Sequence, residues 1–222
     1  MRRFSGRRIT RRAVAVAAAG IVIAAGATAT SLAAWTDTEW VFGSATGNAR
    51  LGTSVFGVQQ SVVGDSTAFT DRSTADGGSM VFTVNAASLS PGADVFGYVN
   101  LRTIVKSVGA TVVLNPATQG ATTDADLFAA LVYSARVVGA SVTCDASVFS
   151  AATSASIQEI VPTTTALTVG SGSSTFALDA GTTTDPGTAK RVCFRVTLPA
   201  GASSSLQGKG AYPVWNFVST SS

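Results

Sequence analysis

The chain holds few side chains in the patterns that catalyse reactions. Two pairs of carboxylates lie close in sequence, Asp37 with Glu39 and Asp124 with Asp126, and a carboxylate pair is what a glycosidase uses as general acid and base. Asp124 and Asp126 stand where a helix N-terminus favours negative charge. Asp37 and Glu39 fall at the start of the expected mature chain. We therefore interpret both pairs as structural and predict no catalytic residue.

Metal and phosphate sites are also not expected. Calcium at Asp124 and Asp126, or at Asp71 and Asp76, would lack the dense Asp/Asn/Gly spacing of a loop site. The composition counts no histidine, which removes Ser-His-Asp and Cys-His catalysis and imidazole zinc sites. The glycines at 170–172 lack the Gly-Lys-Ser/Thr ending of a phosphate-binding loop. We predict no enzyme, no metal and no cofactor.

The two cysteines, Cys144 and Cys193, are predicted to form a disulfide. An even number of cysteines in an exported chain favours a bond between them. A reactive thiol would need a basic partner, usually histidine. Closing a loop of about 50 residues stabilises a fold by roughly 3 to 4 kcal/mol in the chain-entropy model. We expect a structural role.

The N-terminal sequence predicts export. Six arginines between Arg2 and Arg12 precede an apolar run from Ala13 to Ala34 that ends in small residues, the order of a secretory signal. We predict a helical signal peptide over 1–33, cleaved near Ala33 and Ala34. The run is also long enough for a membrane anchor, the weaker alternative because Ala, Gly and Thr insert poorly. Arg11 and Arg12 leave the Sec and twin-arginine routes both open.

Cleavage reverses the charge of the protein. The six arginines leave from a total of 15 basic residues while all 12 acidic ones stay, so nine basic residues face twelve acidic ones and the net charge is near −3. The cations that remain are scattered apart from Lys190 and Arg191. No nucleic-acid partner is predicted, and membrane contact is expected only through the signal peptide before cleavage.

The mature chain, 34–222, is predicted to be one all-β domain. It is rich in Val, Thr, Ser, Gly and Ala and poor in helix-forming charged residues, and short apolar runs alternate with turn residues. Strands are predicted at Leu51–Gln60, Ser79–Ala86, Val95–Lys106, Ala110–Leu114, Leu131–Val138, Thr165–Val169, Thr175–Leu178, Arg191–Leu198 and Ala211–Ser219.

Their spacing favours a two-sheet sandwich with one short helix. That helix is expected at Thr123–Ala130, capped by Thr123 or Asp124. The Thr/Ser/Gly-rich segments Gln158–Gly172 and Ala180–Thr188 are interpreted as loops or weak edge strands.

Several stretches resemble the TasA/camelysin family of exported proteins. The first is the apolar signal followed by an Ala-aromatic-x-Asp sequence and a Gly-ended strand. Two more are a Leu-x-Pro-Gly-Asp-like stretch before a long strand and a Gly-Thr turn, and the last is a Leu-Pro, Gln-Gly and Phe ending. These lie at Leu32–Glu39 with Leu51–Thr53, Leu89–Val99, Val108–Val112, and Cys193–Gly201 with Ser205–Gly208 and Val214–Phe217.

The resemblance implies a jelly-roll sandwich, cleavage by a signal peptidase of the SipW type, and a place at the cell surface or in the biofilm matrix, where relatives form fibres. The first residues after cleavage, within 34–48, are β-prone and could add as a strand to a neighbouring subunit. Trp35, Asp37, Glu39, Trp40 and Phe42 are the residues expected in that strand. The alternative is that the segment begins the protein's own first strand.

The leading functional hypothesis is therefore a secreted, self-associating structural protein. A monomeric extracellular adhesion or ligand-binding β-sandwich is the second, and a secreted hydrolase is the third and weakest.

Overall fold

The computed structural model describes residues 54–62, 69–74, 78–83 and 86–222, all within one compact unit, Gly52–Ser222. The predicted signal peptide, its cleavage site at Ala33 and Ala34, and the predicted N-terminal strand lie outside these residues. Within the described part of the chain, no helix is long and apolar enough to cross a membrane.

The larger sheet has five antiparallel strands in the order β1-β2-β8-β5-β6. Its strands alternate in side-chain direction, as an antiparallel sheet with one buried face requires. In β8, Val192, Phe194 and Val196 are buried in the core, while Arg191 and Arg195 point to the opposite face. The strands are β1 (Val58–Ser61), β2 (Asp94–Thr103), β8 (Lys190–Thr197), β5 (Val132–Gly139) and β6 (Gln158–Ala166).

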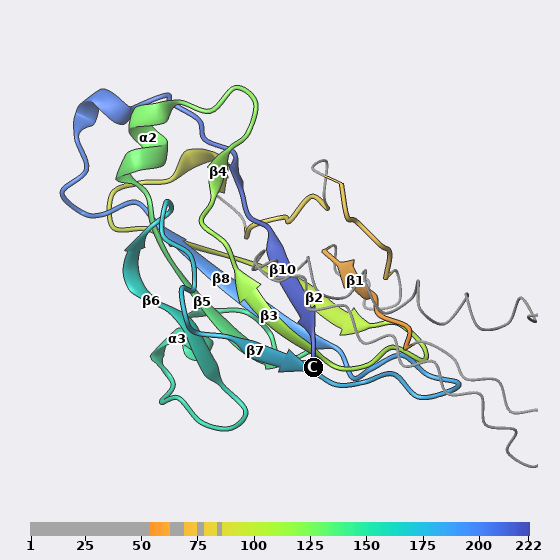
Figure 1. The fold of residues 1–222 in the computed structure, drawn as a ribbon. Coiled ribbons are helices and arrows are strands. Elements are labelled where there is room, and N and C mark those ends of the chain that lie inside the picture. Colours follow the sequence, from red (N-terminus) through yellow and green to blue (C-terminus); the bar gives the residue numbers. More distant parts are fainter. Residues whose placement is uncertain (1–53, 63–68, 75–77, 84–85) are drawn as a thin grey trace, which may run out of the picture. The chain divides into compact units, whose positions relative to one another are not determined.

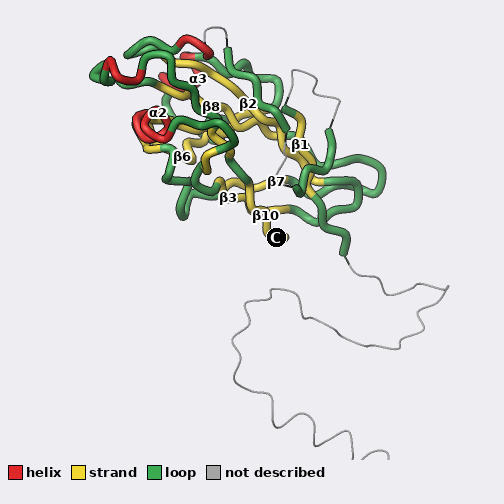
Figure 2. Tube along the Cα trace, turned by 90° about the horizontal axis from the view of Figure 1, so that it is seen from above, coloured by secondary structure: helices red, strands yellow, loops and turns green. Residues whose placement is uncertain are grey.

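A smaller sheet packs against the buried face of the larger one. It has three antiparallel strands, β10 (Phe217–Ser221), β3 (Ala110–Leu114) and β7 (Phe176–Leu178). A separate pair joins β4 (Thr118–Gln119) to β9 (Pro213–Val214). Apolar side chains from both larger sheets form one core, and Figure 2 shows the three-stranded sheet lying along the five-stranded one.

An aromatic cluster occupies the middle of this core. The ring of Trp215 lies 4.9 Å from that of Phe194 and 5.6 Å from that of Tyr133, centroid to centroid. The Tyr133 hydroxyl donates to the carbonyl of Val169 at 2.6 Å. Burial raises the pKa of Tyr133 to about 12, although its contact with the Trp215 indole opposes the shift. Tyr133 therefore stays neutral and acts as a donor.

Two short helices accompany the sheets, where one was expected. The predicted helix is α2 (Ala125–Ala130), and Asp124 caps it by accepting from the amides of Asp126 and Leu127 at 3.0 and 3.1 Å. The second, α3 (Ala146–Ser150), is capped by Asp145. Five residues are too few for a helical periodicity to be visible in the sequence. Two 3₁₀ turns, η1 (Ala86–Ser88) and η2 (Ser204–Leu206), complete the elements (Figure 1).

The all-β prediction is confirmed, with local corrections. The strand at Ala110–Leu114 has the predicted bounds, whereas Ala211–Ser219 divides into β9 and β10. No strand forms in the described residues of Ser79–Ala86, although Thr83 exchanges hydrogen bonds with Phe96 of β2. Of the two interpretations of Gln158–Gly172, the edge strand holds for its first nine residues, which form β6.

Candidate functional site

Polar and aromatic side chains gather on the face of the five-stranded sheet that points away from the core, which we call the outer face. The strand register places them in three rows across β2, β8 and β5. Such rows bring side chains from distant parts of the sequence within contact distance. The rows are Phe96, Arg195 and Ser134; Tyr98, Cys193 and Arg136; and Asn100, Arg191 and Val138.

The predicted disulfide joins this face to the loop that carries α3. Cys193 on β8 is bonded to Cys144, with Cα atoms 5.4 Å apart and a separation of 49 positions in sequence. Both cysteines are buried, and Val138, Val148 and Phe149 pack around them in a second apolar cluster. The predicted bond is confirmed, and its buried apolar surroundings fit a structural role.

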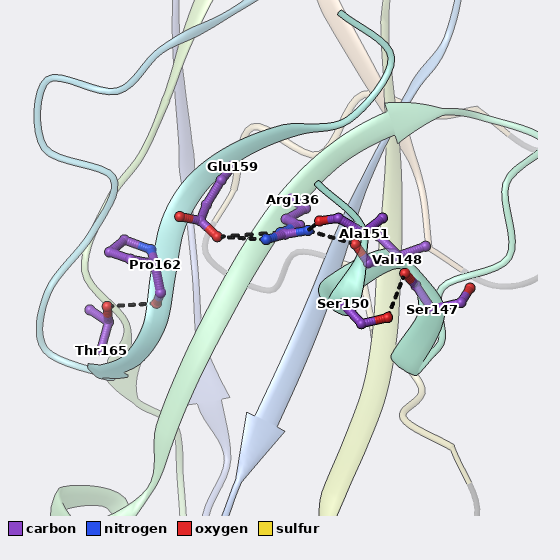
Figure 3. Close-up of polar contacts among 8 residues, drawn as sticks. All are labelled: Arg136, Ser147, Val148, Ser150, Ala151, Glu159, Pro162 and Thr165. Atoms are coloured by element: carbon purple, nitrogen blue, oxygen red, sulfur yellow. Dashed lines mark hydrogen bonds and ion pairs between the residues drawn. The ribbon is translucent and has the colours of Figure 1, made fainter. Parts of the chain in front are cut away.

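Arg136 lies between β6 and α3 and anchors α3 to the sheet (Figure 3). Its Nη1 donates to the carbonyls of Val148 and Ala151 at 2.8 and 2.7 Å, which lie at the end of α3 where helical carbonyls lack partners. Its Nε and Nη2 donate to Glu159 Oε2 on β6 at 3.3 and 3.0 Å. The side chain is 8 % exposed. Arg136 therefore ties β5, β6 and α3 together.

The edge strand β6 bulges away from β5 beside this site. Tyr133 pairs with Thr165 and Ala135 with Val161, so three residues of β6, 162–164, face the single residue Ser134. The Thr165 hydroxyl closes the bulge by donating to the carbonyl of Pro162 at 2.8 Å (Figure 3). A bulge with a proline disrupts the ladder that another strand would need. This edge is therefore protected against strand addition.

Ser134 gives a prediction that tests the packing under the bulge. Its hydroxyl is fully buried and has no hydrogen-bond partner among the described residues. We expect Ser134→Ala to leave the free energy of unfolding unchanged or raise it by up to about 1 kcal/mol, because an unsatisfied polar group is removed. Ser107, also buried, is the matched control, because its hydroxyl accepts from Gly57 and donates to Val108.

Ser107→Ala should lower the same free energy by about 1 to 2 kcal/mol. The free energies of unfolding of both variants, measured by urea unfolding, test these two expectations. A Ser134→Ala variant as destabilised as the Ser107→Ala variant would mean that the Ser134 hydroxyl has a partner.

The remaining arginines of the outer face lie over aromatic rings. The Arg195 guanidinium is 5.2 Å from the Phe149 centroid and 4.0 Å from the Asp94 carboxylate. Those of Arg191 and Arg102 lie 3.9 Å from the rings of Tyr98 and Phe69. In the sequence these cations are scattered, and their common face becomes visible in the sheet. The alternation of Arg with Val and Phe along β8 was the signal that would have placed Arg191 and Arg195 on one face.

Asp124 and Asp126, the carboxylate pair interpreted as structural, both lie beside Lys209. Lys209 Nζ lies 3.2 Å from Asp124 and 2.7 Å from Asp126. The backbone N–H of Leu127 is the main reason that the pKa of Asp124 is lowered, and the two carboxylates raise the pKa of Lys209. Asp124 thus serves as a helix cap, and both carboxylates share Lys209 as an ion-pair partner. In the described residues, no three metal-ligating side chains come together.

Of the other carboxylates considered from the sequence, the structure describes only Asp71. Asp71 is exposed, and Asp76, Asp37 and Glu39 lie outside the described residues, as do Trp35, Trp40 and Phe42.

The edge of β10 is the second notable feature. The amide of Asn115 donates to the carbonyl of Asn216, and that of Ser222 to the carbonyl of Gly109, which fixes the phase of the antiparallel β10–β3 ladder. Even-numbered residues of β10 therefore bond to β3. The amides and carbonyls of the odd-numbered ones, 217, 219 and 221, point to the opposite edge, where no described residue pairs with them.

Comparison of the chain with models of protein families finds no match, and comparison with curated proteins finds no related sequence. The fold and these sites define the chain as an antiparallel β-sheet protein held by one disulfide.

Proposed function

We propose that this is a secreted structural protein of the cell surface or biofilm matrix, whose copies assemble by strand addition. The observation that carries the proposal is the edge of β10, a regular strand of five residues with its outer backbone groups unpaired among the described residues. Unpaired edges pair with other strands unless they are protected.

The other edges are poorer acceptors, which supports β10 as the acceptor. The bulge at Pro162 interrupts β6. Gln60 in β1 exchanges two backbone hydrogen bonds with Thr70 at 2.9 and 3.0 Å. The edge strand β7 has only three residues. Short, bulged or covered edges are the usual protection of sheet proteins.

The donor is the segment that follows the predicted cleavage site. Successive side chains of a strand point to opposite faces. Trp40 and Phe42 would therefore share one face, and Asp37 and Glu39 would share the other. On β10, Phe217 packs inward against Phe194 and Phe176, whereas Val218 is 47 % exposed on the outside. An added strand would thus direct its aromatic face to the core and its acidic face to water.

The disulfide and the predicted signal peptide support an extracellular site. A disulfide persists in oxidising compartments, and a fold held in this way suits a matrix exposed to proteases. The jelly-roll connectivity and the SipW-type peptidase belong to the same proposal, through the family resemblance.

Deleting residues 34–42 and, separately, replacing Ser219 by proline test the donor and the acceptor. Proline at 219 removes an amide that points away from β3, so the β10–β3 ladder keeps its bonds while the edge loses a donor. We expect both variants to stay monomeric in sedimentation velocity and electron microscopy at concentrations where the mature protein forms larger assemblies. Ser219→Ala is the matched control and should assemble.

A mature protein that stays monomeric at high concentration and acidic pH would leave the monomeric adhesion protein as the better account. Assembly that survives the deletion of 34–42 but not Ser219→Pro would keep β10 as the acceptor and discard the donor.

A further inference from the structure

The four arginines of the outer face divide into two kinds. Arg136 and Arg195 lie near carboxylates, those of Glu159 and Asp94. Arg102 and Arg191 have no carboxylate within ion-pair distance among the described residues. We call these two the unpaired arginines. They stand on neighbouring strands, since Arg191 on β8 pairs with Asn100, two residues before Arg102 on β2.

Arg191 is held in one orientation. Its guanidinium lies 3.9 Å from the centre of the Tyr98 ring. Its Nε donates to Asn100 Oδ1 at 2.8 Å and its Nη1 to the carbonyl of Val142 at 2.5 Å. Its Nη2 donates to no described residue. A planar group fixed on a ring with free N–H donors is preorganised for a planar, bidentate acceptor.

Arg102 is held in the same way. Its guanidinium lies 3.9 Å from the Phe69 centroid, and its Nη2 donates to Gln59 at 3.4 Å, a long bond. Its Nε is buried with no hydrogen-bond partner in the described part of the chain. This N–H is enclosed by the protein, so an external anion would have to be bound by the terminal nitrogens of Arg102.

Burial has an electrostatic consequence for both residues. Desolvation lowers the pKa of Arg102 and of Arg191, because burial disfavours the charged form and no described carboxylate offsets it. Arginine nevertheless stays protonated in proteins. An anion bound to this face would offset the cost.

We infer that the unpaired arginines bind carboxylates of an acidic, uronic-acid polysaccharide. Carboxylate geometry matches the guanidinium fork, and the two arginines stand on adjacent strands, so two carboxylates of one linear polymer could engage both. Double-stranded DNA carries a charge about every 1.7 Å, so a chain with mature net charge near −3 should be repelled by it overall. A uronic-acid polymer carries at most one carboxylate per sugar, so its charge density is lower and the repulsion is weaker.

The inference does not depend on assembly, because Arg102 on β2 and Arg191 on β8 belong to the five-stranded sheet, whereas the proposed acceptor edge is β10 of the three-stranded sheet. Polygalacturonate is the probe, and its fully methyl-esterified form is the neutral control with the same backbone. We expect the mature protein to bind polygalacturonate in affinity electrophoresis or calorimetry, with affinity falling as salt rises, and not to bind the ester.

Arg102→Gln and Arg191→Gln should each weaken binding about tenfold, the loss expected for one charge-assisted hydrogen-bonded contact. Lys106→Gln is the matched control, since it removes the same charge from an exposed turn after β2, and it should bind like the mature protein. Thermal unfolding verifies that the variants fold. Arg191→Lys, which keeps the charge but not the planar fork, should bind more weakly than the mature protein.

Equal binding of the ester, or unchanged binding by both glutamine variants, would overturn the inference. Equal or tighter binding of duplex DNA, or of vesicles containing an anionic phospholipid, would also overturn it in favour of those partners. The variant lacking residues 34–42 should bind polygalacturonate normally even where assembly has failed, which separates this test from that of the proposed function.

Discussion

Replacing Arg136 by methionine should lower the free energy of unfolding by about 3 kcal/mol. The change leaves the carbonyls of Val148 and Ala151 without their donor and Glu159 without its partner. Each buried carbonyl left unsatisfied costs roughly 1 to 3 kcal/mol. Methionine has a similar length and is apolar, so packing is largely kept and the loss reports the polar contacts. Urea or thermal unfolding measures the effect.

Arg195→Met is the matched control on the same face. Arg195 is 22 % exposed and lies 4.0 Å from Asp94, which is 35 % exposed, and such a partly solvated pair contributes about 0 to 1 kcal/mol. We expect a loss within about 1 kcal/mol. Equal losses in the two variants would show that Arg136 acts as an ordinary surface cation and does not secure α3.

Removing the disulfide, by Cys144→Ala with Cys193→Ala, should have a comparable or larger effect. The bond closes 49 residues of sequence, and the chain-entropy model gives about 3 to 4 kcal/mol for a loop of this length. For a chain of this size that is a fall in Tm of about 10 °C. Reduction of the unmodified protein should lower its Tm by a similar amount in differential scanning calorimetry.

Comparing the reduced protein with the double-alanine variant separates loss of the bond from loss of packing. Reduction breaks the bond and keeps both sulfur atoms, whereas alanine also removes their contacts in the apolar cluster. The double-alanine variant should be unaffected by reductant, which is the control for effects of the reductant itself. A Tm that stays unchanged both on reduction and in the variant would mean that the bond contributes nothing to stability.

Combining the two changes tests whether they act on one unit. The disulfide and Arg136 both fasten the segment that carries α3, one through Cys144 and the other through Val148 and Ala151. Residues that share a structural unit show non-additive effects. We expect the triple variant to lose less free energy of unfolding than the sum of the two separate losses. Once α3 has detached from the sheet, the remaining contact no longer stabilises it.

Much of the fold could be predicted from local patterns. Alternating apolar residues identify β3 with the observed bounds and most of β2, β5 and β8, because burial of one sheet face imposes a period of two. The Asp124 cap follows from a side chain and amides two and three residues away. The disulfide was predictable because only two cysteines exist.

The candidate sites were less predictable, because their contacts are non-local. Arg136 and Glu159 are 23 residues apart, and Arg191 and Asn100 are 91 apart. The sequence indicates that such residues lie on strands but not which strands are neighbours.

By itself, then, the sequence determined the all-β class, the absence of histidine chemistry and the cysteine pair, because composition and period are properties of the chain. Among the described residues, the tertiary structure alone decided which arginines lie near carboxylates, where α3 is held to the sheet and which sheet edge has no partner strand. A side chain's face depends on its own strand, but its partners depend on strand order and register. Both of those are set by packing of the whole core.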